Sequence, residues 1–200
     1  MISDISNIIV GVSAVVVAVV AVFGLNSWRK EIVGKSKYDL AKRLMLLVNR
    51  LEDEFGWARF SLSESGEYLE RPRPPDEPAA ITPIRNEWFL RKHRIQPLKK
   101  DMLELHEANW EAQTILDEDT SKVVGDGVKR LSASLADLDT SVDYYFEAKE
   151  EEARGISTNV DSEWLAGLRK TIYGRANDDF SRQINEVVIK FGSALKKYLH

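Results

Sequence analysis

The stretch IIVGVSAVVVAVVAVFGL, residues 8–25, contains no charged side chain. As a helix rising 1.5 Å per residue it would extend roughly 27 Å, close to the thickness of a bilayer's hydrocarbon core. The preceding MISDISN has no Lys or Arg, which argues against a cleaved signal peptide, and a core helix of this length would show a polar face. The run therefore predicts a single transmembrane helix at residues 8–25, preceded by a short extracytoplasmic N-terminus at residues 1–7.

The residues directly after the apolar run are rich in Lys and Arg. Five of them form the predicted membrane-interface set, which is Trp28, Arg29, Lys30, Lys35 and Lys37. Tryptophan favours the headgroup level, and Lys and Arg accumulate on the cytoplasmic side of membrane proteins. We therefore expect a single-pass inner-membrane protein with the N-terminus outside, residues 26–200 in the cytoplasm, and the lipid bilayer as a partner.

Small residues recur every three or four positions within the apolar run, at Gly11, Ala14, Ala18 and Ala21. This spacing places them on one stripe of a helix, where small side chains let two helix backbones approach closely. The stripe predicts packing against a second copy or against a helix of another protein. The plain alternative is a chance alignment of common residues.

Helical periodicity continues through most of the remaining chain. Apolar positions three and four residues apart predict helices at residues 32–62, 84–116, 120–154 and 161–173, and in the last 24 residues. Five of the six prolines mark a loop at residues 63–83, Pro97 should kink or split the second helix, and Thr120 or Ser121 should cap the third. The expected fold class is all-α: the membrane helix followed by an antiparallel cytosolic helical bundle of about four long helices.

The search for reactive groups is mostly negative. The chain has no cysteine, and His93, His106 and His200 share no motif. Glu104, Glu107 and Glu111 share one helix face and could bind a cation, although such a row more often faces solvent. We therefore predict no enzyme activity, no catalytic residues, no metal or other cofactor and no small-molecule ligand. The net charge of -4 also argues against a nucleic-acid partner.

Four tryptophans follow the membrane-interface region, at Trp57, Trp88, Trp110 and Trp164. Large aromatic side chains are expected to anchor the core of a bundle. Exposed tryptophans would instead mark a protein interface.

Three segments carry a resemblance to known proteins: SWRKEIVGKSKYDLAKRLMLLVNRLEDEF, WEAQTIL and DDFSRQINEVVIKFGSALKKYL. Together they resemble a family of uncharacterised bacterial proteins with one N-terminal transmembrane helix and a cytosolic helical region. The resemblance implies a bacterial inner-membrane location, and it implies no activity, cofactor or site residue.

Three functional hypotheses follow. The first is a membrane-tethered helical interaction module that holds or regulates a protein partner at the cytoplasmic face of the membrane. The alternative is a self-assembling membrane effector, for example in stress or phage response, that oligomerises through its transmembrane helix. An enzyme built on a helical bundle is the third, and no motif supports it.

Overall fold

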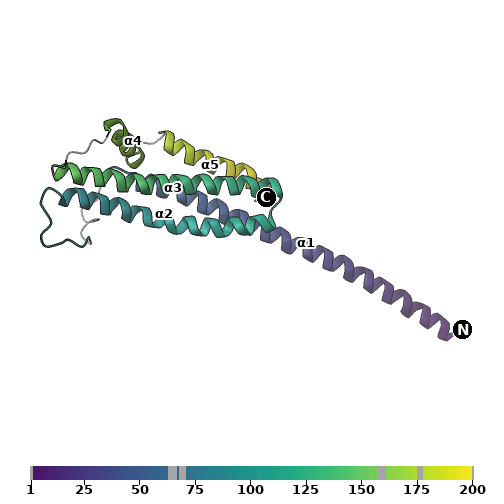
Figure 1. Cartoon of the computed structure of the whole chain (residues 1–200). Helices are drawn as coiled ribbons and strands as arrows, with labels where there is room; N and C mark the ends of the chain where they lie inside the picture. Colours follow the sequence, from purple (N-terminus) through teal and green to yellow (C-terminus); the bar gives the residue numbers. More distant parts are fainter. Residues whose placement is uncertain (1, 63–66, 68–70, 157–160, 175–177, 200) are drawn as a thin grey trace.

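The computed structural model describes the backbone of residues 2–62, 67, 71–156, 161–174 and 178–199; the side chains of residues 2–16 and 18 are outside this description. The regular elements are α1 (Ile2–Ala58), α2 (Thr82–Ile115), α3 (Glu118–Ala153), α4 (Ser162–Ile172), α5 (Asp179–Leu195) and the short 3-10 helix η1 (Lys196–Tyr198). Figure 1 shows an elongated bundle from which the first part of α1 projects. Over the described residues the expectation of an all-helical chain is confirmed.

The second half of α1 enters the bundle at Leu40. From there its buried side chains follow the three-and-four spacing that places them on one helix face, namely Leu40, Ala41, Leu44, Leu47, Val48, Leu51, Phe55 and Ala58. They join a single core with buried apolar side chains of α2, α3 and α5, such as Leu98, Leu105, Leu131, Leu138, Val187 and Phe191. Burial of this shared apolar surface is the main stabilising term of the fold.

The four long helices form a ring around that core. α1 packs on α2, α2 on α3, α3 on α5, and α5 returns to α1, while α4 packs on α3. Asp178, just before α5, pairs with Arg59 at the end of α1, and Lys197 after α5 pairs with Asp117 at the start of α3. Neighbouring helices therefore run antiparallel, as in an up-down-up-down bundle.

The ends of the helices differ in detail from the sequence-based expectations. The N-cap of α3 is Asp117, whose side chain accepts a hydrogen bond from the backbone N–H of Thr120 at 3.1 Å. The predicted caps, Thr120 and Ser121, lie inside the first turn instead. α2 runs through Pro97 as one helix, so the proline does not split it.

Two buried arginines of α2 bind the chain that leaves α1. Arg91 donates to the carbonyls of Ala58 and Phe60 at 3.2 and 2.6 Å. Arg94 donates to the carbonyls of Phe60 and Leu62, both at 2.9 Å. The last carbonyls of a helix and those just beyond it lack helical N–H partners, and these guanidinium groups supply them. The end of α1 is thereby held against α2.

The prediction of a transmembrane helix at residues 8–25 is wrong, and with it the inner-membrane location and the orientation with the N-terminus outside. Within the part of the chain that the structure describes, no helix has both the length and the apolar character needed to cross a membrane. The described uncharged run extends from residue 19 to Trp28 and ends at Arg29. At 1.5 Å per residue it covers roughly 15 Å, about half of a bilayer core. Residues 8–16 and 18 of the predicted span lie outside the described side chains.

Candidate interaction surfaces

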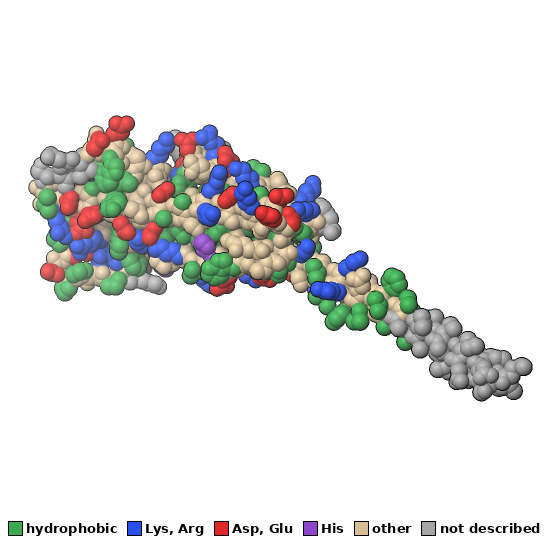
Figure 2. All heavy atoms as spheres, turned by 45° about the vertical axis from the view of Figure 1, so that its right-hand side comes forward, with side chains coloured by type: hydrophobic (Ala, Val, Ile, Leu, Met, Phe, Trp, Pro, Cys, Tyr) green, Lys and Arg blue, Asp and Glu red, His purple; other side chains and the backbone are tan. Residues whose placement is uncertain are grey.

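The arm, defined here as residues 17–37 of α1, carries a large exposed apolar surface. Among its described large apolar side chains, six are more than 60% exposed: Val17, Val20, Val22, Phe23, Leu25 and Trp28. Successive residues of an α-helix are about 100° apart, so these side chains point to several sides of the arm. Figure 2 shows hydrophobic side chains gathered on the arm beside the bundle. Contiguous apolar surface of this kind marks an interaction site.

The predicted membrane-interface residues all lie on the arm. Trp28, Arg29, Lys30 and Lys35 are exposed, and their side chains form no hydrogen bond or ion pair with another described element. Lys37 is partly covered, and its Nζ lies 5.9 Å from the centre of the Tyr198 ring. All five residues therefore lie on the projecting part of α1, and Lys37 lies where the arm meets the bundle.

The predicted packing stripe is only partly visible. Gly11, Ala14 and Ala18 lie outside the described side chains, and Ala21 is exposed on the arm. Packing through this stripe stays a prediction.

The tryptophans of the helical body do not anchor the core as predicted. Their exposed fractions are 43% for Trp57, 37% for Trp88, 65% for Trp110 and 44% for Trp164. The core is filled by aliphatic side chains and phenylalanine instead. Trp57 lies under the guanidinium of Arg94, with 4.3 Å between Cζ and the ring centre. Periodicity placed these residues on helices correctly but could not assign their faces, because large apolar residues occupy both faces.

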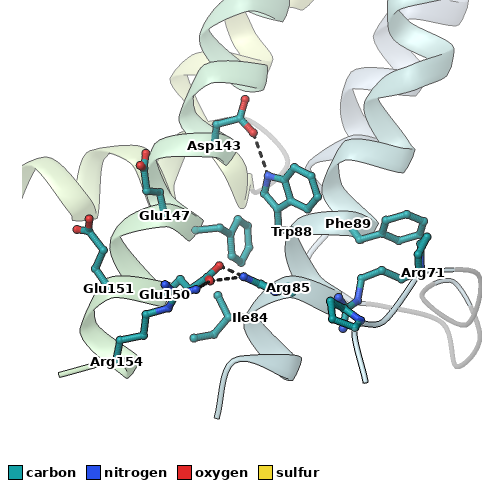
Figure 3. A pocket seen from close by; sticks show the side chains of 13 residues that line it. Arg71, Ile84, Arg85, Trp88, Phe89, Asp143, Glu147, Glu150, Glu151 and Arg154 are labelled. Carbon is teal, nitrogen blue, oxygen red and sulfur yellow. Dashed lines mark hydrogen bonds and ion pairs between the residues drawn. The ribbon is translucent and has the colours of Figure 1, made fainter. Parts of the chain in front are cut away.

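A cavity of about 860 Å³ opens between the start of α2 and the end of α3, at the end of the bundle opposite the arm (Figures 1 and 3). Its apolar lining comes from Pro72, Pro74, Ile84, Trp88, Phe89 and Phe146. Phe146 is buried, while Trp88 remains partly exposed at the opening. Cavities of this size with mostly apolar walls and a few polar groups are typical of binding sites.

The arginines that line the cavity are already paired with carboxylates. Arg71 donates to Glu77 at 2.8 Å, and Arg85 donates to Glu77 and to Glu150 at 3.3 and 2.6 Å. Arg154 also pairs with Glu150. The hydrogen bonds from Arg71, with help from Arg85, lower the pKa of Glu77 to about 2. Each of the three arginines therefore already has an ion-pair partner, and the three share two carboxylates.

The edge formed by α3 carries a row of carboxylates at Asp143, Glu147 and Glu151 (Figure 3). Asp143 accepts hydrogen bonds from the indole N–H of Trp88 and from Lys92, both at 2.9 Å. The side-chain carboxylates of Glu147 and Glu151 have no ion-pair or hydrogen-bond partner among the described residues. The cavity thus combines an apolar floor with two carboxylates on α3 that form no ion pair with a described residue. This site has no local sequence pattern that could predict it, because its walls come from segments more than 50 residues apart.

A second group of carboxylates lies between α1 and α2. Glu54 and Asp101 each have one buried oxygen that accepts no hydrogen bond from the described residues, although Asp101 forms an ion pair with Arg50 at 3.0 Å. Burial, and then the charge of Asp101, raise the pKa of Glu54 to about 7, while Arg50 opposes the shift. Glu54 is therefore partly protonated near neutral pH.

Replacing Glu54 with glutamine should stabilise the fold at pH 8. The folded-state pKa of about 7 lies above the reference value of 4.5, so the wild type loses stability as pH rises between these values. The full shift would correspond to about 3 kcal/mol, and solvent screening of this partly exposed group reduces the expected gain to about 1–2 kcal/mol. Urea unfolding at pH 4.5 and pH 8 measures it: the two proteins should differ at pH 8 and converge at pH 4.5. An equal difference at both pH values would refute the assignment.

Two of the candidate reactive residues, His106 and Glu111, contact side chains of other helices. Nε2 of His106 lies 3.0 Å from the hydroxyl of Ser132, and Glu111 pairs with Arg43 of α1 at 3.1 Å. Among the described residues no three His, Cys, Asp or Glu side chains are grouped so that they could hold a metal ion. The row of Glu104, Glu107 and Glu111 therefore does not form a cation site with its neighbours there. His200 lies outside the described residues.

No protein-family model, curated protein or solved structure matches this chain. The resemblance to bacterial proteins with one membrane helix stays a prediction that these comparisons leave untested.

Proposed function

We propose that this chain is a protein-interaction module that holds a protein partner through the arm of α1. The observation that carries the proposal is the exposure of large apolar side chains along the arm, from Val17 to Val33, with no other element covering them. A helix that is apolar on several sides is normally buried, because each Å² of apolar surface removed from water contributes roughly 25 cal/mol. The partner is expected to enclose the arm on more than one side.

The charges near the base of the arm indicate the chemistry of that partner. Arg29, Lys30 and Lys35 are exposed, and Glu31 is the one acid between them. Opposite charges across an interface speed association and exclude wrong partners. We therefore expect a partner with an apolar groove for residues 17–28 and acidic side chains beyond it.

Self-assembly through the arm is the second candidate function. Ala21 is an exposed small residue of the predicted stripe, and a second copy could supply the apolar covering. Two parallel arms would place their basic residues side by side, which costs free energy and favours a foreign partner.

Photo-crosslinking in producing cells tests the proposal. A photoreactive amino acid replaces Val22 on the arm in one variant and Thr140, exposed on α3, in the matched control. We expect one discrete protein adduct from position 22 and none from position 140. A second substitution, Phe23→Glu, should abolish the adduct, since burying an unpaired charge is costly.

The identity of the adduct separates the candidates. Recurrent crosslinking to one foreign protein, lost with Phe23→Glu and reproduced with purified components, supports the proposed module. Crosslinking only between copies of this chain would replace it with self-assembly. Equal labelling at positions 22 and 140, or no adduct, would overturn both.

A further inference from the structure

The cavity between α2 and α3 lies at the other end of the bundle from the arm and is not needed for the function proposed above. We propose that it is a second docking site, which takes a basic segment of a protein partner: one apolar anchor side chain flanked by Lys or Arg. Three features of the cavity favour this occupant: its apolar floor, its charged side chains and the spacing of its carboxylates. None of them involves the arm.

The floor suits an apolar anchor. Ile84, Trp88 and Phe146 present aliphatic and aromatic surface from two different helices. The indole of Trp88 is held in place by its hydrogen bond to Asp143, so little side-chain freedom remains to be lost on binding. Large side chains inserted into such preformed apolar pockets supply most of the free energy of a protein interface.

The charges select a basic segment. Arg71, Arg85 and Arg154 share two carboxylates, Glu77 and Glu150, so each guanidinium already has an ion-pair partner. On α3, beside Glu150 and Arg154, the carboxylates of Glu147 and Glu151 form no ion pair with a described residue (Figure 3). A Lys or Arg placed against them would gain two new ion pairs, and its alkyl stem would cover part of the exposed Trp88 ring.

The spacing of the carboxylates suits a polypeptide better than a compact molecule. Asp143, Glu147 and Glu151 follow one another at four-residue intervals on α3, roughly 6 Å per step and roughly 12 Å in all. Basic residues at positions i and i+4 of a helix, or i and i+2 of an extended segment, have nearly the same spacing. Either segment lying along α3 would match the row while its anchor enters the cavity.

The test uses the full chain and three fluorescently labelled synthetic peptides. The probe peptide is a short helix with one leucine anchor and lysines at i and i+4; one matched peptide has glutamates in place of the lysines, and the other has serine in place of the leucine. Fluorescence anisotropy measures each dissociation constant. We expect the probe peptide to bind at least tenfold more tightly than either matched peptide, and its binding should weaken at 1 M salt.

Charge reversal on α3 supplies the protein side of the test. Glu147→Lys with Glu151→Lys should weaken binding of the probe peptide about tenfold, as two lost pairs of roughly 0.7 kcal/mol each imply. Asp137→Lys, at an exposed position of α3 outside the cavity, is the matched control and should change it less than twofold. Thermal melts confirm that each variant is folded.

Three results would overturn the proposal: no measurable binding of the probe peptide to the folded wild type, equal binding of the glutamate peptide, or equal effects of the cavity and control reversals. None of them depends on the arm. Failure here therefore leaves the photo-crosslinking result at position 22 to be judged separately.

Discussion

Replacing Arg59 with alanine should lower the melting temperature by about 10 °C, the largest single effect that we expect in this chain. Arg59 is buried and pairs with Asp178 at 2.6 Å. Removing one member of such a pair leaves a buried charge uncompensated, which costs about 3–5 kcal/mol, and each kcal/mol shifts the melting temperature of a chain of this size by about 2–4 °C. Thermal unfolding followed by circular dichroism measures the change.

The effect should be large because Arg59 joins three separate segments. Its guanidinium donates to the carbonyls of Lys170 and Thr171 at the end of α4, at 3.1 and 2.7 Å. It also donates to the hydroxyl of Ser181 in α5 at 3.0 Å. Burial would raise the pKa of Asp178, but the hydrogen bonds from Arg59 hold it well below its usual range. Without the Arg59 side chain, the end of α4 and the start of α5 lose these hydrogen bonds to the end of α1.

A matched control lies on α5, next to the partners of Arg59. Arg182 pairs with Asp179 at the surface, where both side chains are more than half exposed. Arg182→Ala should change stability by less than about 0.5 kcal/mol, because exposed pairs of this kind contribute little. Arg59→Lys keeps the charge but loses the planar fork, so its stability should lie between wild type and Arg59→Ala. If Arg59→Ala and Arg182→Ala melted at the same temperature, the bridging role would be refuted.

Gly127→Ala should destabilise the bundle by about 2 kcal/mol, even though alanine is the better helix former. A Cβ at residue 127 would lie 2.3 Å from Cε2 of Phe191 and 3.0 Å from Cγ1 of Val187. Both side chains are buried in α5, so α5 itself would have to shift. Overpacking of this kind costs about 1–3 kcal/mol, occasionally more, and has to exceed the gain of roughly 1 kcal/mol in helix propensity. Urea unfolding gives the difference.

Gly125 provides the comparison two residues earlier on α3. Its added Cβ would meet only Oδ1 of Asn109, at an ordinary 3.6 Å. Gly125→Ala should therefore stabilise the chain by about 0.5–1 kcal/mol through helix propensity alone. Combining Gly127→Ala with Phe191→Leu should restore part of the lost stability, which identifies the ring as the obstacle. A stabilising Gly127→Ala would show that α5 does not approach α3 this closely.

The helices themselves were predictable because their buried positions repeat locally. The apolar positions that the sequence spacing places on one helix face, from Leu40 to Ala58, are the positions that α1 buries in the core. The short helix predicted at residues 161–173 agrees with α4, and the helix predicted in the last 24 residues agrees with α5. These features depend on neighbours within one or two turns.

Features that join distant segments were not predictable in the same way. Arg59 meets partners more than 110 residues away, and nothing beside it in the sequence distinguishes it from a surface arginine. Helix propensity alone indicates that Gly127 weakens α3. In the bundle, its missing Cβ leaves room for the ring of Phe191. The cavity has no sequence signature either, because its apolar and acidic walls belong to two helices that meet only in the fold.

For the apolar run at residues 8–25, a local sequence pattern led to a wrong prediction. Its composition suggested a membrane span, but the described part of it is a short stretch of a much longer helix that turns polar at Arg29. Hydropathy identifies apolar side chains that are stabilised by removal from water. It does not identify whether lipid, another helix or a partner protein covers them.

The continuity of α1 from arm to bundle has a mechanical consequence. Residues 34–40 contain no proline and no break in the helix, so twist and bending applied to the arm reach Leu40 with little loss. Inserting one residue there would rotate the arm by about 100° about its axis relative to the core, and inserting four would nearly restore the original phase. A partner bound to the arm would therefore have a fixed rotational orientation, about the axis of α1, relative to the bundle.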